Sequence, residues 1–237
     1  MFSKRSTEKE LVDDLALGDP ALTRNLQELE CVNNWLGGKA TLISALDEVY
    51  RRHPHLLGAR TIAIADLGCG GGDLLRAVHE WARSKLLDVE LTGIDANPFM
   101  VRHAIEQSLT SGKIRFETTD VLSEAFRAKR FDIVCLNTFC HHLGDADLVR
   151  LLRQLGTQAG TAIIVNDLHR HWIAWVSIRW ISRLLNFSHL ARHDGPLSVL
   201  RAFRKRELMD LIERAGFDRP LVRWRWAFRW EVILWKQ

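Results

Sequence analysis

A glycine-rich segment carries the strongest chemical signal in the sequence. It runs Asp66-Leu-Gly-Cys-Gly-Gly-Gly-Asp73, directly after a short apolar run and at the start of a helical pattern. Glycines let a backbone turn tightly and approach a ligand closely, and the first turn of a helix offers free N–H groups. A dinucleotide fingerprint that began at Gly68 would need glycine where the chain has Asp73. The segment therefore disfavours NAD, and its carboxylate at the strand end suits a positively charged ligand.

This segment resembles the first motif of the class I S-adenosylmethionine-dependent methyltransferases, an acidic residue followed by G-x-G-x-G. The resemblance covers the chain from about Thr61 to Asp167 and implies that S-adenosylmethionine is the cofactor. It implies that Asp95 binds the two ribose hydroxyls, because a carboxylate accepts bidentately from neighbouring O–H donors. It also implies that Asp120 binds the adenine amino group. The cofactor-binding residues implied are Asp66, Gly68, Cys69, Gly70, Gly72, Asp95, Ala96, Asp120, Val121 and Asn137.

Several of these residues have structural alternatives that the sequence leaves open. Asp66 could cap its turn, and Asp120 could cap the turn after its strand. Asp95 could be the cap of the helix that begins at Asn97-Pro98. The thiol of Cys69, like that of Cys135, is interpreted as a small packing group and not as a nucleophile.

Two adjacent histidines are the candidates for acid–base chemistry. His141 and His142 follow the fourth strand at its carboxyl end, where open α/β sheets bind ligands. Methyl transfer depends chiefly on alignment of the acceptor, and it needs a base only when the acceptor loses a proton, as a phenol does. The sequence does not choose between the two histidines or exclude a structural role for them. Asp167 and His169, at the end of the fifth strand, are further candidates.

We predict no metal site. His141, His142 and Asp167 could in principle hold an ion, but neither H-x-x-H nor H-x-x-x-H spacing is present.

Short apolar runs alternate with helical patterns from residue 61 onward, as in a parallel α/β sheet. We predict α/β architecture, with a Rossmann-like, seven-stranded, mostly parallel sheet and a C-terminal antiparallel hairpin. N-terminal helices and an inserted helix after the fifth strand complete it. The predicted strands span residues 61–66, 89–95, 114–119, 131–136, 162–166, 221–226 and 228–235, and the predicted helices span 72–84, 98–109, 145–155 and 204–215.

The first sixty residues are predicted to be helical. Asp19-Pro20 is a typical helix start, Gly37-Gly38 a typical end, and a second helix is expected over residues 39–53. These helices either cover one end of the domain or gate the substrate. We assign residues 1–58 to an N-terminal helical cap and residues 59–237 to the methyltransferase domain, with residues 168–203 as a substrate-lid insertion.

Tryptophan is concentrated in the second half of the chain. The sequence has nine Trp and one Tyr, and seven of the Trp follow residue 170. Residues 168–190 form an apolar, Trp-rich helical pattern with one polar side, followed by a break at Gly195-Pro196. This helix could roof an apolar pocket, lie on a membrane surface or pack in the core. Arginine and tryptophan then alternate over residues 221–226, which predicts a strand with one exposed and one buried face.

Composition narrows the class of protein. The 237 residues are 47% hydrophobic and 26% charged, which suits one soluble α/β domain, and the four cysteines form no C-x-x-C pair. The N-terminus is too polar for a secretory signal, so a cytoplasmic location is expected. The net charge is +4, and residues 201–237 hold ten basic and five acidic residues. This excess is local, so DNA is excluded as a partner and RNA is not expected.

The downstream half indicates the acceptor. The segment from His193 to Phe203, with Ala215-Gly-Phe217, resembles bacterial methyltransferases of polyketide or quinone-like metabolites. We therefore predict methylation of a hydrophobic small molecule, on a phenolic or other hydroxyl oxygen. Two alternatives remain: an RNA methyltransferase that uses the C-terminal arginines, and a non-catalytic protein that binds S-adenosylmethionine. The sequence does not indicate the oligomeric state.

Overall fold

The computed structural model describes residues 2–15, 17, 21–54, 61–109 and 114–236. The predicted helix start at Asp19-Pro20 and the boundary between residues 58 and 59 lie outside these ranges, so the division into a cap and a domain stays a prediction.

Within the described residues, the chain forms one seven-stranded sheet in the order β3-β2-β1-β4-β5-β7-β6. The first five strands are parallel, and β7 runs antiparallel between β5 and β6. The predicted fold class is confirmed. The strands are β1 (Ile62–Leu67), β2 (Val89–Asp95), β3 (Ile114–Thr118), β4 (Phe131–Asn137), β5 (Ala159–Leu168), β6 (Leu221–Arg225) and β7 (Arg229–Trp235).

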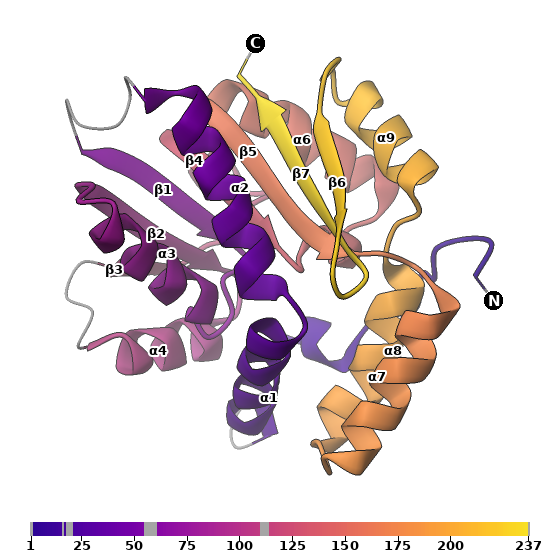
Figure 1. The fold of residues 1–237 in the computed structure, drawn as a ribbon. Helices are drawn as coiled ribbons and strands as arrows, with labels where there is room; N and C mark the ends of the chain where they lie inside the picture. The colour runs from indigo at the N-terminus through magenta and orange to yellow at the C-terminus, as the bar shows by residue number, and fades with distance from the viewer. Residues whose placement is uncertain (1, 16, 18–20, 55–60, 110–113, 237) are drawn as a thin grey trace.

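Helices cover both faces of the sheet (Figure 1). One face carries α2 (Gly38–Arg52), α3 (Asp73–Ser84) and α4 (Pro98–Gln107); the other carries α6 (Asp145–Gln158) and α9 (Lys205–Arg214), with α5 (Glu124–Arg127) beside them. Strand side chains alternate between the faces, so Ile62 and Ile64 pack under α2 and α3 while Ala65 and Leu67 pack under α6. Because both faces are covered, the central strands are apolar almost throughout.

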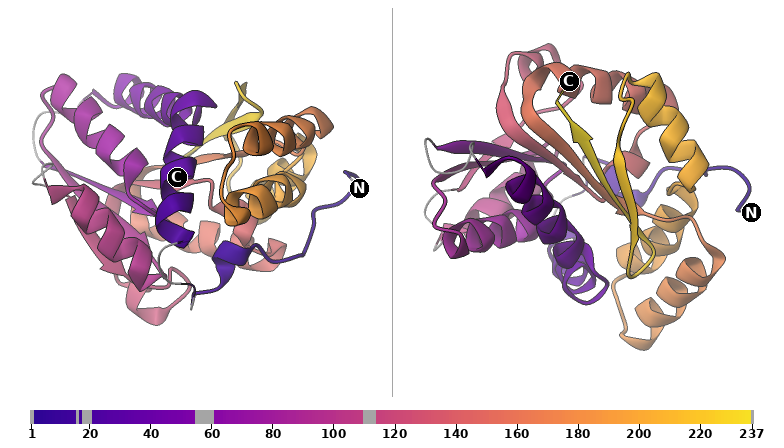
Figure 2. Two further views of the ribbon diagram at one scale, coloured as in Figure 1. Left: turned by 90° about the horizontal axis from the view of Figure 1, so that it is seen from below. Right: turned by 45° about the horizontal axis from the view of Figure 1, so that its top comes forward.

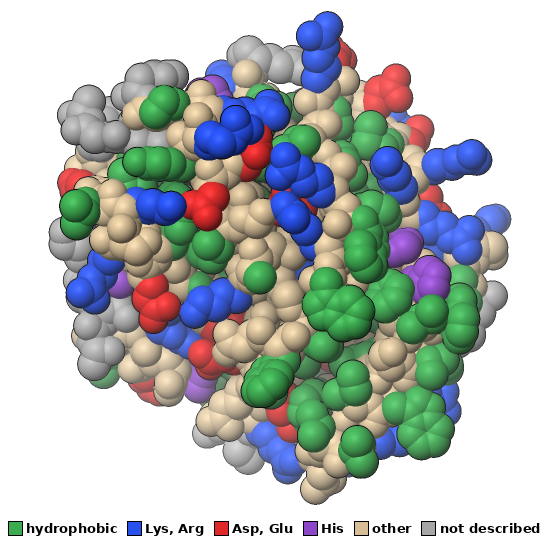
Figure 3. All heavy atoms as spheres, in the orientation of Figure 1, with side chains coloured by type: hydrophobic (Ala, Val, Ile, Leu, Met, Phe, Trp, Pro, Cys, Tyr) green, Lys and Arg blue, Asp and Glu red, His purple; other side chains and the backbone are tan. Residues whose placement is uncertain are grey.

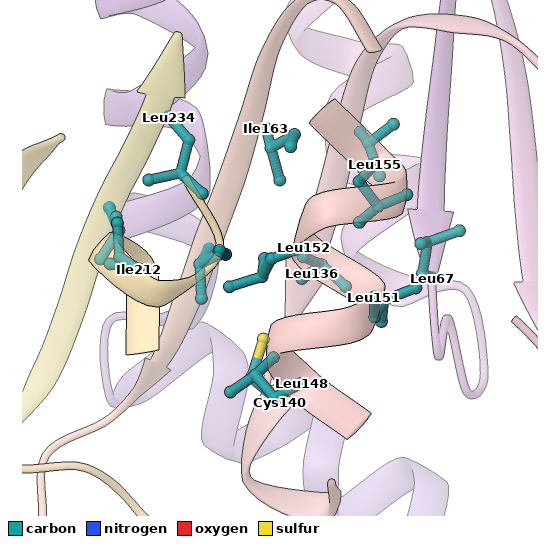
Figure 4. Close-up of a cluster of buried hydrophobic side chains, with 14 of the residues drawn as sticks. Leu67, Leu136, Cys140, Leu148, Leu151, Leu152, Leu155, Ile163, Ile212 and Leu234 are labelled. Carbon is teal, nitrogen blue, oxygen red and sulfur yellow. The ribbon is translucent and has the colours of Figure 1, made fainter. Parts of the chain in front are cut away.

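The larger core lies between the sheet and α6 (Figure 4). Leu148, Leu151, Leu152 and Leu155 recur at helical spacing on α6 and face strand residues such as Leu136. This packing holds β4 and β5 in register, and the carboxyl ends of those two strands carry the candidate base and its partner.

Helices α1 (Ala21–Trp35), α7 (Trp172–Leu184) and α8 (His189–Arg201) lie beyond the carboxyl ends of the parallel strands (Figures 1 and 2). The N-terminal segment passes between them (Figure 2). We call residues 2–15 and 17 the N-terminal segment. The prediction that the first sixty residues are helical is wrong for it, because η1 (Leu11–Asp13) is the one helical turn among these described residues. Its polar side chains bind other elements instead, as Glu10 does to Ser198.

The insertion after β5 contains two helices, where one was predicted. The break expected at Gly195-Pro196 is wrong, because α8 continues through Pro196. The chain turns earlier, at Asn186, whose φ of 50° is left-handed, and Ser188 then caps α8 by accepting from the Ala191 N–H. None of the described helices is both long and apolar enough to cross a membrane.

In β6 the arginines and the tryptophans lie on opposite faces, but no residue of the strand is buried, so the predicted buried face is only half-buried. The arginine face turns inward, since Arg223 and Arg225 pair with the buried Glu231, and Arg223 also pairs with Glu48 of α2. The tryptophan face, with Trp224 and Trp226, is exposed.

The α6 core predicts a clear stability difference between two leucines. Leu151→Ala removes a fully buried side chain and should lower the free energy of unfolding by about 2–5 kcal/mol. Leu184→Ala, at an exposed site, should change it by less than about 0.5 kcal/mol. Urea unfolding followed by circular dichroism measures both. Equal effects would show that α6 does not form the core described.

Candidate active site

A cavity of about 1280 Å³ lies at the carboxyl ends of the parallel strands. The glycine-rich turn after β1 forms one end of it, and α7, α8 and the N-terminal segment form the other. Pockets for a single drug-sized ligand range from about 300 to 1,000 Å³, so this cavity has room for a cofactor and a second molecule.

The glycine-rich turn adopts the backbone its sequence requires. Gly68, Gly70 and Gly72 all have left-handed φ angles, of 68°, 50° and 73°. A Cβ on Gly68 would lie 2.2 Å from the Phe139 ring, so glycine is needed there for space as well. The turn leads into the N-terminus of α3 with its backbone open to the cavity.

Three carboxylates surround this turn: Asp66, Asp73 and Asp95. Asp66 is buried at the end of β1 and accepts a hydrogen bond of 2.8 Å from the Asn137 side-chain amide. Burial, together with the charges of Asp73 and Asp95, raises the pKa of Asp66 to about 7. The same burial and acidic neighbours raise the pKa of the Cys69 thiol well above its usual range, in keeping with a packing role.

Asp95 is not the cap of α4. The cap is Asn97, whose side chain accepts from the Phe99 N–H at 2.9 Å. Asp95 instead accepts from the Gly70 N–H, also at 2.9 Å, so the end of β2 is tied directly to the glycine turn. The adjacent Ala96 lines the cavity.

The remaining predicted cofactor residues also border the cavity. Asp120 is exposed and accepts from the Leu122 N–H, so it does support the turn after β3, while Val121 is buried beside it. Asn137 ends β4 and accepts from the side chain of Asn166. The structure thus brings nine of the ten predicted cofactor residues to the lining of one cavity, while Gly72 is buried in the turn. Their binding roles stay predictions.

His141 is buried and held from two sides. Its Nδ1 lies 2.7 Å from Oδ1 of Asp167, at the end of β5, and its Nε2 lies 3.6 Å from Oε1 of Glu10. Burial raises the pKa of the Asp167 carboxyl, but the charge and hydrogen bond of His141 lower it further, so the pKa falls below its ordinary value. Asp167 therefore stays ionised and fixes the orientation of the His141 ring.

His142 is held in the same way by the N-terminal segment. Its Nδ1 lies 2.6 Å from Oδ1 of Asp13, and its ring centroid is 4.3 Å from that of His141. Arg201 of α8 pairs with the other oxygen of Asp13. Burial raises the Asp13 pKa, but the hydrogen bonds and charges of His142 and Arg201 lower it further, to below its usual range.

His169, the further base candidate, lies at the opposite wall. Burial, with the charges of His171 and Arg170, lowers its pKa to about 4. The Trp224 indole N–H donates to its Nδ1 at 3.2 Å. This ring is therefore neutral and a weak base near neutral pH.

Two contributions to the site were missed from sequence. Glu10 is buried, its Oε1 has no hydrogen-bond partner, and burial raises its pKa to about 7. Arg229 is fully buried on the cavity wall, donating to the Leu36 carbonyl and, at 3.3 Å, to Asn33 Oδ1. For Glu10, the one signal in the sequence is its spacing of three residues from Asp13 within a polar N-terminus.

A cation could be held by Glu10, His141 and His142. One ligand atom from each lies within 4.8 Å of the others. Both histidines are oriented by carboxylates on their Nδ1 atoms, an arrangement also found around metal-binding histidines. The guanidinium of Arg201, whose Nε is 3.6 Å from the same Glu10 oxygen, opposes a cation there. The prediction of no metal is neither confirmed nor contradicted by this geometry.

A family model matches the central part of the chain. Residues 64–157 match the family described as a methyltransferase domain. With the strand order and the glycine-rich turn, this confirms the resemblance to class I S-adenosylmethionine-dependent methyltransferases, whose cofactor is S-adenosylmethionine. No curated protein sequence matches the chain.

Solved structures with this fold include methyltransferases of different specificity. The CurJ carbon methyltransferase aligns at TM-score 0.61 and 11% identity over 79% of this chain and 52% of its own. The plantazolicin methyltransferase BpumL, in complex with SAH, aligns at 0.62 and 16% over 92% and 100%. Human N-acetylserotonin methyltransferase, in complex with SAM, aligns at 0.64 and 16% over 91% and 55%. The chain thus spans about half the length of the first and third, and the likeness shows the fold.

Asp66 predicts a pH dependence of stability. Its folded-state pKa of about 7 exceeds the ordinary 3.8, so its favourable contribution is complete below 3.8 and is lost as the pH rises through 7. Compared with Asp66→Asn, the wild type should lose about 2 to 3 kcal/mol of unfolding free energy between about pH 5 and pH 8. Denaturant titrations of both proteins without cofactor measure it. Asp120→Asn, at an exposed site, is the control; a wild type that gains stability over this range would contradict the assignment.

Proposed function

We propose that this protein transfers the methyl group of S-adenosylmethionine to a hydroxyl oxygen of a hydrophobic, polyketide- or quinone-like small molecule. The observation that carries the proposal is the position of His141. It lies on the wall of the cavity that the glycine-rich turn and α7 also line, and Asp167 holds its ring.

The residues around the glycine-rich turn fit this cofactor by charge. Asp66, Asp73 and Asp95 are partly or fully buried, and burial raises the pKa of each. A ligand with cationic groups relieves that cost, and S-adenosylmethionine carries a sulfonium and an ammonium group. Asp95 and Asp120 would hold its ribose and adenine, and Arg229 offers a cation for its carboxylate. The cofactor supplies an activated methyl group.

His141 would accept the proton of the acceptor hydroxyl. With Nδ1 on Asp167, the proton would go to Nε2, which faces Oε1 of Glu10 at 3.6 Å, so the acceptor hydroxyl would have to enter beside Glu10. Asp167 stabilises the protonated ring that forms, as a carboxylate behind a general base does. We assign the base to His141 over His142 because Asp167 is part of the rigid sheet, whereas Asp13, the partner of His142, lies in the N-terminal segment.

Apolar residues surround the acceptor end of the cavity. Ile178 and Ile181 of α7 line it, as does Phe187. The turn between α7 and α8 is bound to α1, since Glu28 accepts from Ser188 and Arg24 donates to the Asn186 carbonyl. Residues 168–203 therefore act in this proposal as a lid over the acceptor.

The alternatives receive less support. An RNA methyltransferase would need a free basic surface, but Arg223 and Arg225 pair with carboxylates and Arg229 is buried. A non-catalytic cofactor-binding protein would not need the His141–Asp167 pair. A carbon acid would also lose its proton to His141, so the assay must distinguish oxygen from carbon acceptors.

Transfer of tritiated methyl groups to phenols, quinols, carbon acids and RNA tests the proposal. We expect labelling of hydrophobic phenols or quinols on oxygen. His141→Gln should lower kcat by about 100- to 10,000-fold and leave cofactor affinity unchanged. His193→Gln, at an exposed site on α8, is the matched control. Labelling of RNA alone, or full activity of His141→Gln, would contradict the proposal.

The same assay separates a base from a metal ion. Activity that survives prolonged treatment with a chelator supports His141 as the base. Activity that is lost with the chelator and restored by a divalent ion would assign Glu10, His141 and His142 to a metal instead.

A further inference from the structure

Helix α7 exposes large apolar side chains on the side away from the cavity. Trp172, Trp180 and Leu184 have exposed fractions of 57%, 68% and 85%. Trp180 lies eight residues after Trp172 and Leu184 four residues after Trp180, so the three form one ridge along the helix. The opposite side, with Ala174, Ser177, Ile178 and Ile181, lines the cavity. The sequence predicts one polar side for this helix. In the structure the apolar ridge is exposed as well, and Ser182 from the predicted polar side is buried.

The C-terminal hairpin extends this surface. Trp224 packs edge-on against Phe228, and Phe228 stacks on His171, directly before α7. Trp224 and Trp226 are 47% and 68% exposed. In Figure 3, hydrophobic side chains gather over the end of the hairpin and over α7. We call this surface the tryptophan face; it is formed by Trp172, Ile173, Trp180, Leu184, Leu185, Trp224 and Trp226. Trp226 also borders the cavity.

The charged residues of α7 and its flanking turns have one sign. Residues 168–193 contain four arginines and no acidic residue. Arg179 and Arg183 lie exposed on α7, between the apolar residues of the ridge. Within the described part of the chain, no carboxylate is within ion-pair distance of either guanidinium, and Arg179 lies over the Trp175 ring. Exposed tryptophans interleaved with arginines are typical of a helix that lies in the interface of an anionic bilayer.

We propose that the tryptophan face binds the surface of an anionic lipid bilayer, with α7 lying along the membrane plane. Such a position places Trp226, which borders the cavity, at the membrane surface. A hydrophobic acceptor could then reach the cavity from the membrane without crossing water. The proposal of lipid binding depends on the tryptophan face alone. The delivery of an acceptor from the membrane also depends on the proposed function.

Vesicle cosedimentation tests the proposal. The full chain is mixed with vesicles of phosphatidylcholine that contain about one third phosphatidylglycerol, and with pure phosphatidylcholine vesicles. We expect binding to the anionic vesicles that weakens as salt is raised. The variant with Trp172→Ser, Trp180→Ser and Leu184→Ser should bind at least about tenfold more weakly. Leu109→Ser, an exposed leucine away from this face, is the matched control.

A second variant isolates the charges. Arg179→Gln with Arg183→Gln should weaken binding to the anionic vesicles and leave binding to neutral vesicles unchanged. Melting temperatures and circular dichroism spectra should match the wild type in both variants, which shows that they fold. If no acceptor is methylated, the vesicle result still stands and only the delivery route fails.

Three results would overturn the proposal. They are absence of binding to either vesicle, equal binding by the wild type and the triple variant, and equal binding to anionic and neutral vesicles. Sedimentation velocity tests the alternative that a second copy of the chain binds the tryptophan face. A dimer that the triple substitution dissociates, with no vesicle binding, would assign the face to a second copy of the chain.

Discussion

The arrangement of the cavity depends on two buried carboxylates, Asp66 and Asp167, near the C-terminal ends of two parallel strands. Asp66 ends β1 and Asp167 lies near the end of β5, and both are removed from water. The charge and hydrogen bond of His141 offset the cost of burying the Asp167 carboxylate, so the pKa of Asp167 falls. Asp66 has only the neutral amide of Asn137, so burial and its acidic neighbours raise its pKa to about 7. One end of the cavity therefore favours an incoming cation, and the other holds an oriented imidazole.

The two ends are connected by hydrogen bonds across the strand ends. Asn166 of β5 donates to Asn137 of β4, which donates to Asp66 of β1. The Thr138 N–H donates to the Asn166 carbonyl at the point where the chain leaves β4 for His141. Because these contacts join adjacent strands in register, the geometry between cofactor and acceptor is set by the sheet and its α6 core. The N-terminal segment then adds Glu10 and Asp13 from outside the sheet.

Much of the sheet and the cofactor end could be predicted because both depend on local patterns. The glycine turn needs residues at fixed spacing, and each strand of the sheet is a short apolar run between turns. The role of Glu10 could not be predicted, since it comes from folding of a polar segment against α8, nearly two hundred residues away. The end of α7 was missed because Gly195-Pro196 is a strong breaker by composition, while Asn186 and Ser188 form the actual turn. The exposure of Trp172 and Trp180 depends on which side of α7 faces the cavity, which only the tertiary structure defines.

Proton linkage of cofactor binding tests the central claim most directly. Titration calorimetry with S-adenosylmethionine near pH 7, in buffers of different ionisation enthalpy, measures the protons exchanged on binding. If Asp66 faces the cationic cofactor, binding lowers its pKa from about 7, and the complex should release a fraction of a proton that Asp66→Asn abolishes. Proton uptake, or a release that persists in Asp66→Asn, would contradict the account.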